Sequence, residues 1–179
     1  MNVFHHQVRQ GGKRLVPLLI SFIVLLALLF VGFAPLMDGL TVRDGRTGKL
    51  LLALPIRQEE TFSIRYIHSV NLSPVIDTLQ WSGQDLVLRT TLFSDYGWGM
   101  PVLADGIGTH FEHTPDGFLI SGIDKAQASV PILLQQVPDH HILYRGREIS
   151  LLKLAGSGAF LRIAGERMNL LAFFTHSQA

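Results

Sequence analysis

An uncharged run from Leu15 to Met37, made mainly of Leu, Ile, Val and Phe, constrains this chain more than any other feature. As a helix, the run would extend roughly 34 Å, which is enough to cross a hydrocarbon core of about 30 Å. A buried core helix would rarely be apolar on every face over such a length. We therefore expect a transmembrane helix over residues 15–37.

The same run could be a signal sequence that is cleaved, because Gly32-Phe33-Ala34 has the small residues of a cleavage site. Pro35 would then follow the cut directly and would hinder processing, and the apolar run is longer than a usual signal core. These two points favour an uncleaved signal anchor.

Basic residues flank the run on both sides: Arg9, Lys13 and Arg14 before it, and Arg43, Arg46 and Lys49 after it. The local charge is therefore balanced, but a long domain is translocated largely regardless of its charges, and a first helix tends to follow its N-terminal flank. We expect residues 1–14 to be a cytoplasmic tail and residues 38–179 to be an extracytoplasmic domain.

Composition excludes several classes of function. A net charge of +1 gives no bulk electrostatic reason to bind nucleic acid. The absence of cysteine excludes a disulfide scaffold, a thiolate zinc site and a cysteine nucleophile.

Period-two patterns dominate after residue 38 and predict a mainly β domain, an antiparallel sandwich or a barrel-like fold. Pro131 should keep its strand away from the centre of a sheet. The residues Gly156-Ser157-Gly158 are interpreted as a hairpin turn. The expected strands are 40–42, 50–54, 61–69, 75–81, 86–93, 109–113, 118–123, 130–137, 141–144, 149–154, 160–163 and 168–174, the last of which could instead be a short helix.

Residues 61–81 predict a hairpin that places polar groups among core residues. Alternation puts Phe62, Ile64, Tyr66 and His68 on one face, and Val75, Asp77, Leu79 and Trp81 on the matching face. A four-residue loop, 70–73, would set Tyr66 opposite Asp77 and make His68 and Asp77 diagonal neighbours.

This hairpin allows three interpretations. The first is a structural network in which Asp77 orients a partly buried His68 and Tyr66 completes the hydrogen bonding. The second is a site that binds a ligand or a partner. A hydrolytic triad is disfavoured, because Ser69 points to the opposite face and Ser73 lacks a nucleophile elbow.

Two further segments carry candidate chemistry. His110 and Glu112 share a strand face at a spacing that metals accept, so His68, Asp77, His110 and Glu112 form an alternative metal site. Because two such residues on a strand often arise by chance, we expect no metal and no cofactor. The segment 94–101 is glycine-rich and aromatic, which is typical either of a contact surface or of a simple loop; its candidate contact residues are Ser94, Gly97, Trp98, Gly99, Met100 and Pro101.

Three blocks of sequence point to a family. Tyr66-Ile67-His68-Ser69-Val70, followed by Ser73-Pro74-Val75 and Asp77, resembles the first motif of domain-of-unknown-function family eighteen-fifty, which consists of small membrane-anchored bacterial proteins. Phe93-Ser94 with Gly97-x-Gly99-Met100-Pro101 is similar to its second block, and His141 followed by Gly146 to its third. The chain departs from the family where Asn71 replaces a common glutamate, Asp77 replaces glutamate and Trp98 stands where alanine is frequent.

The resemblance implies a place in the bacterial inner membrane beside TRAP transporters of the TAXI class, which pair an extracytoplasmic solute-binding protein with a membrane permease. We therefore expect a non-enzymatic accessory protein whose periplasmic β domain contacts the permease, the solute-binding protein or both. The alternatives are a membrane-tethered module for a small ligand or a metal and, less favoured, a periplasmic hydrolase.

Overall fold

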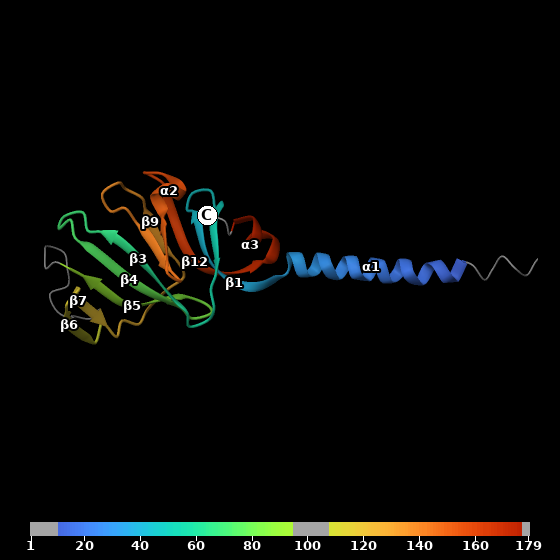
Figure 1. Ribbon diagram of the computed structural model, residues 1–179, viewed down its shortest axis with the longest axis horizontal. Coiled ribbons are helices and arrows are strands. Elements are labelled where there is room, and N and C mark those ends of the chain that lie inside the picture. Colours follow the sequence, from blue (N-terminus) through green and yellow to red (C-terminus); the bar gives the residue numbers. More distant parts are fainter. Residues whose placement is uncertain (1–10, 95–107, 177–179) are drawn as a thin grey trace, which may run out of the picture.

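The computed structural model describes residues 11–94 and 108–176. One long helix, α1 (Gly11–Phe33), projects from a β domain (Figure 1). The strands are β1 (Pro35–Asp44), β2 (Leu50–Pro55), β3 (Thr61–Ile67), β4 (Pro74–Trp81), β5 (Leu86–Phe93), β6 (His110–Thr114), β7 (Gly117–Ser121), β8 (Lys125–Gln127), β9 (Val130–Leu133), β10 (His141–Tyr144), β11 (Arg147–Ser150) and β12 (Phe160–Asn169). Two short helices complete the described chain, α2 (Leu151–Ala155) and α3 (Leu170–His176).

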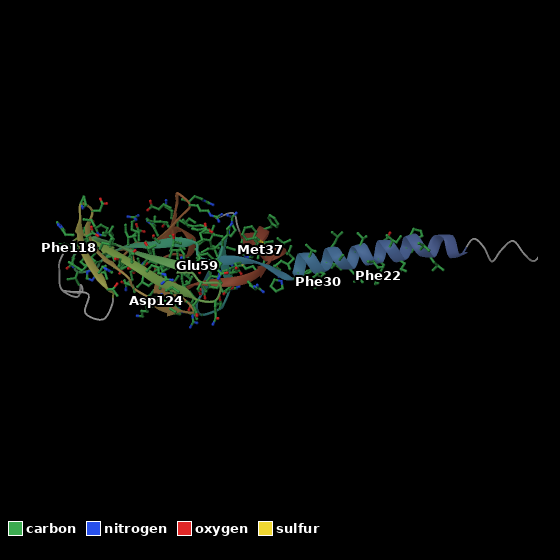
Figure 2. All side chains as sticks on the ribbon, turned by 90° about the horizontal axis from the view of Figure 1, so that it is seen from below. Phe22, Phe30, Met37, Glu59, Phe118 and Asp124 are labelled. Atoms are coloured by element: carbon green, nitrogen blue, oxygen red, sulfur yellow. The ribbon has the colours of Figure 1, made fainter. Side chains whose placement is uncertain are left out.

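From Leu15 to Phe33, helix α1 consists almost entirely of apolar residues, and none of them is buried. Its segment Leu15–Phe33 has 19 residues with a mean hydropathy of 2.9, which is long and apolar enough to cross a membrane. Figure 2 shows Phe22 and Phe30 on a part of α1 that stands clear of the β domain. The helix ends at Phe33 rather than at Met37, because Pro35 begins β1 and pairs with Asn169 of β12.

The predicted antiparallel β fold is confirmed as two sheets. The smaller sheet has the order β2-β1-β12-β9, and the larger has the order β11-β10-β3-β4-β5-β7-β6, with β8 paired to β5. Strand β9, which carries Pro131, lies at an edge as predicted, because proline cannot donate to a central ladder.

The main core lies between the two sheets. Leu40, Val42 and Leu161 of the smaller sheet pack in one cluster with Ile64 and Leu79 of the larger sheet. A second, smaller cluster lies toward the far end of the larger sheet and contains Val75, Phe93, Ile120 and Ile123. The larger sheet therefore extends beyond the core that it shares with the smaller one.

The strands predicted after residue 149 differ from those observed. The stretch 149–154 is divided between β11 and α2, because the Ser150 side chain caps the helix by accepting a hydrogen bond from the Lys153 amide at 3.3 Å. The stretches 160–163 and 168–174 are not two strands, since β12 runs unbroken to Asn169; the alternative of a short helix in the second stretch is confirmed by α3, which begins at Leu170. Consequently Gly156-Ser157-Gly158 connects α2 to β12 and is not a hairpin turn.

Gly165 lies inside β12, between the two stretches that were predicted as separate strands. A Cβ atom at this position would lie 2.1 Å from the Trp81 ring. Trp81 is 3% exposed and comes from the opposite sheet. Gly165 thus allows the two sheets to approach each other at this point.

Candidate interaction site at the distal hairpin

The loop that joins β3 to β4 closes with its own hydrogen bonds. The His68 amide donates to the Ser73 carbonyl at 2.8 Å, and the Leu72 amide donates to the His68 carbonyl at 2.8 Å. Leu72 adopts a left-handed conformation with φ 52°, which lets the chain turn inside the loop. The Ile67 amide also donates to the Pro138 carbonyl at 2.7 Å, so the end of β3 is tied to the segment before β10.

The predicted register of this hairpin was wrong by two residues. Asp77 lies opposite Ile64, and Tyr66 lies opposite Val75. The loop between the paired residues His68 and Ser73 has four residues, as expected, but it consists of residues 69–72 instead of 70–73. A shift of two keeps every side chain on its predicted face, which is why the core residues of the hairpin are still buried as expected.

This register separates His68 from Asp77. Asp77 faces a residue four positions before His68, and four residues span about 13 Å along a strand. The predicted contact between the two side chains is therefore absent. His68 instead accepts a hydrogen bond at Nδ1 from the Asn71 amide at 3.3 Å, which places its remaining proton on Nε2 when the ring is neutral.

Asp77 forms a different polar network on the inner face of the larger sheet. The Thr91 hydroxyl donates to its Oδ1 at 2.8 Å. Burial raises the pKa of Asp77, and the Thr91 hydrogen bond opposes this rise only in part. Tyr66 is its diagonal neighbour, and burial together with the Asp77 charge raises the pKa of Tyr66 to about 12.

His140 joins this network through its ring. It stacks on Tyr66 with ring centroids 5.3 Å apart and planes 23° from parallel. Burial lowers the pKa of His140, against the opposing effect of the nearby Asp139 charge. Its Nδ1 atom is buried and has no hydrogen-bond partner among the described residues. The His140 ring therefore lies against Tyr66 with one buried nitrogen that has no partner among the described residues.

The outer surface of the loop is apolar and exposed. Val70 and Leu72 are each 68% exposed, and Ser69 and Ser94 are also exposed. The loop lies at the end of the β domain opposite α1 (Figure 1). The other candidate contact residues, Gly97, Trp98, Gly99, Met100 and Pro101, lie outside the described residues.

The four residues of the alternative metal site are not brought together. In residues 11–94 and 108–176, no three His, Asp or Glu side chains form a group that could hold a metal ion. His110 and Glu112 are exposed on the edge strand β6, and His110 Nδ1 lies 2.8 Å from the hydroxyl oxygen of its neighbour Thr109. The spacing of these two residues on a strand was therefore not a sign of a shared site.

A second polar cluster lies on the other face of the sheet and was not anticipated from sequence. Arg65 contacts Glu148 and His141, and His141 Nδ1 lies 2.7 Å from Glu148 Oε1. The hydrogen bond from Arg65, together with the Arg65 charge, lowers the pKa of Glu148. The neighbouring residues His140 and His141 therefore have different partners, because the His140 ring stacks on Tyr66 whereas the His141 ring contacts Glu148.

Comparison with known proteins identifies the family and nothing beyond it. A family model described as "Domain of unknown function (DUF1850)" matches residues 62–151, half of the chain, from β3 to the start of α2. The chain belongs to this family. The DUF1850 match covers the distal hairpin, the polar network and the Arg65 cluster. No curated protein and no solved structure gives a significant match.

Proposed function

We propose that this DUF1850 protein is a non-enzymatic accessory protein, held in the bacterial inner membrane by α1, whose distal hairpin docks on a partner protein. The observation that carries the proposal is the exposed apolar loop of Val70 and Leu72, held in shape at the end of the domain farthest from α1. Exposed apolar side chains on an ordered loop are suited to protein contact, since little conformational entropy is lost on binding.

In the proposed topology residues 1–14 form a cytoplasmic tail and the β domain lies in the periplasm, because a first helix tends to follow its N-terminal flank and a long domain is translocated largely regardless of its charges. In this arrangement α1 sets the domain at the membrane, and the loop of Val70 and Leu72 points away from it. The partner is then a protein of the periplasmic face, either a membrane permease with a periplasmic surface or a soluble periplasmic protein.

The resemblance to proteins found beside TAXI-type TRAP transporters supplies the partner of this proposal. We assign the distal hairpin to contact with the TRAP permease or with its solute-binding protein. The surroundings of His68 support a contact function over catalysis. Its Nδ1 atom is engaged by the Asn71 amide, and the neighbouring Ser69 has no hydrogen bond to it in the described part of the chain.

Co-purification in mild detergent tests this proposal. The wild-type chain should be recovered with the permease or the solute-binding protein, and Val70→Asp with Leu72→Asn should abolish recovery without changing the thermal melt. Leu133→Asp is the matched control, because Leu133 is 51% exposed but lies on the edge strand β9. Clean separation of the wild-type chain from both candidates, with unaltered solute uptake in a deletion strain, would overturn the proposal.

A second candidate function rests on the His140 network. The Nδ1 atom of His140, which has no partner among the described residues, and the Tyr66 ring stacked on this imidazole would together suit a small polar ligand, which would make the chain a membrane-tethered binding module. Calorimetry with the transported solute should then show binding that His140→Phe removes. Retained co-purification by the same variant would separate this function from protein docking.

A further inference from the structure

Helix α3 has two different faces. Ala172 and Phe173 pack on the outer face of the smaller sheet, in a cluster with Leu50, Ala53 and Met168. The opposite face is apolar but exposed, with Leu171 at 52% and Phe174 at 68%. Residues three positions apart on a helix share a face, so these two side chains form one apolar surface.

The start and orientation of α3 are fixed. The Asn169 side chain accepts a hydrogen bond from the Ala172 amide at 2.7 Å, which is the usual arrangement of a helix cap. Asn169 is also the last residue of β12 and pairs with Pro35 of β1. The exposed face of α3 therefore keeps a constant position relative to the first residue of β1.

This face lies where α1 meets the β domain. Helix α3 contacts α1, and Figure 1 shows it between α1 and the sheets. Leu36, which is 58% exposed, follows the last residue of α1 by three positions, and Met37 beside it marks the junction in Figure 2. The exposed apolar side chains of α3 and Leu36 are therefore gathered at the base of the domain.

The length of α1 sets the depth of this base in a bilayer. The 19 residues from Leu15 to Phe33 extend about 28 Å as a helix, close to the hydrocarbon thickness of about 30 Å. A helix that crosses the hydrocarbon core therefore leaves the residues just after Phe33 at the level of the lipid headgroups, a layer of roughly 5–7 Å.

We propose that Leu36, Leu171 and Phe174, here named the α3 foot, insert into the interface of the leaflet that faces the β domain. Amphipathic helices rest at this boundary with their apolar face about 5–10 Å deep. Arg167 precedes the first residue of α3 by three positions; its Nε lies 3.8 Å from Asp38 Oδ1, but its side chain is 80% exposed and can also offer its charge to phosphate headgroups. The α3 foot thus holds the β domain at a set tilt on the bilayer.

This inference rests on the proposed membrane anchoring by α1. The bilayer is chosen as the occupant because it is continuous with the surface of α1, which is unburied over its whole candidate span. A partner protein or a second copy of the chain would need an additional association event, whereas lipid is present wherever α1 is inserted.

Single-cysteine labelling of the full chain tests the inference directly, since the natural sequence contains no cysteine. Leu171→Cys and Phe174→Cys would be labelled with an environment-sensitive fluorophore and reconstituted in phosphatidylethanolamine–phosphatidylglycerol vesicles that contain no other protein. Leu25→Cys reports on the insertion of α1, and Leu25 is 53% exposed in the native chain. Leu72→Cys at the distal loop is the water-exposed control, and Leu72 is 68% exposed.

Labels at positions 171 and 174 should emit at shorter wavelength than the label at 72, and lipids with a nitroxide near the headgroup should quench them about twofold more than lipids with a deep nitroxide. The label at 25 should show the reverse preference, and the label at 72 should not be quenched. This pattern would support the α3 foot.

Two other patterns would overturn it, and they differ from each other. If the label at 25 is deep while those at 171 and 174 behave like the one at 72, the α3 foot is wrong and the anchor stands. If the label at 25 is itself unquenched, anchoring by α1 fails and the α3 foot fails with it. Shielding of 171 and 174 only after permease is added, or only at high protein density, would assign this face to a protein contact instead.

Discussion

The two ends of the β domain differ in how many apolar residues they bury and in which polar groups lie beside them. At the end near α1, both sheets face each other across one continuous apolar core, and α3 covers part of the outer face. At the distal end, a small cluster of four buried residues lies beside a polar network of Tyr66, Asp77, Thr91 and His140. The end near α1 therefore contributes most of the stability. The distal end contains buried polar groups, which lower the stability, and the exposed apolar side chains of Val70 and Leu72.

Matched truncations should give the largest difference between the two cores. Leu161→Ala in the main core should lower the free energy of unfolding by about 4 kcal/mol, because closely packed neighbours cannot fill the cavity. Ile123→Ala in the distal cluster should cost about 2 kcal/mol, since fewer buried residues surround it. Urea denaturation of the full chain in detergent measures both, and equal losses would contradict the comparison.

The contact between the sheets at Trp81 predicts a somewhat smaller effect. Gly165→Ala should destabilise the domain by about 3 kcal/mol, because the new methyl group meets the Trp81 ring. In a Trp81→Leu background the same substitution should cost much less, since the ring is gone. Additive losses in this double-mutant cycle would show that Gly165 is needed for another reason.

The buried carboxyl group of Asp77 should lower the stability of the folded state, and this effect should depend on pH. Burial raises the pKa of Asp77 above 3.8, so the folded state binds the proton more tightly and loses relative stability as the pH rises through the folded pKa. Asp77→Asn should therefore be more stable than the wild type at pH 7, and the gain should vanish as the pH falls below 3.8. Asp116→Asn, in an exposed turn, is the control in thermal melts at both pH values.

An ion pair near α1 should have the opposite effect on the pH dependence of stability, and this effect should be the smallest of those predicted. Arg145 donates to both oxygens of Glu60, at 2.7 and 2.8 Å, and this pairing lowers the pKa of Glu60 from 4.5 to about 2. The stability from this pair is complete above pH 4.5 and is lost as the pH falls toward 2. Glu60→Gln should cost about 0.5–1 kcal/mol at pH 7, because solvent screens a partly exposed pair.

A comparison of the same two proteins at low pH is the control for this prediction. At pH 2 the wild type and Glu60→Gln should melt at nearly the same temperature. About half of the Glu60 side chains in the folded wild type are then protonated, and a protonated glutamate is neutral, as glutamine is. A difference that persists unchanged at pH 2 would mean that packing, and not charge, accounts for the loss.

Sequence patterns predicted the fold well where alternation was uninterrupted. Strand β5 and strand β10 have the predicted bounds, because alternating or apolar runs are bordered by turn residues. The prediction failed at β12, which was expected as two strands. Gly165 lies inside this continuous strand, and its lack of a side chain leaves room for the Trp81 ring of the other sheet. Such a tertiary cause leaves no local signal in the sequence.

The candidate site was predicted only in part, for a similar reason. Parity correctly placed Tyr66 and Asp77 on one face, but the register depended on Leu72, whose left-handed conformation is unusual for a leucine. Thr91 and His140 were missed, although the first faces Asp77 on the neighbouring strand and the second precedes β10. Only the order of strands in the sheet brings these residues together.

The pairing of β1 with β12 also has a mechanical consequence. Strand β1 follows α1 almost directly, and it pairs with β12 from Pro35 and Asn169 to Asp44 and Leu161. The hydrogen bonds of an antiparallel pair lie perpendicular to the strands. A pull on α1 along the axis of β1 would therefore load these hydrogen bonds in shear, all at once, instead of breaking them one after another.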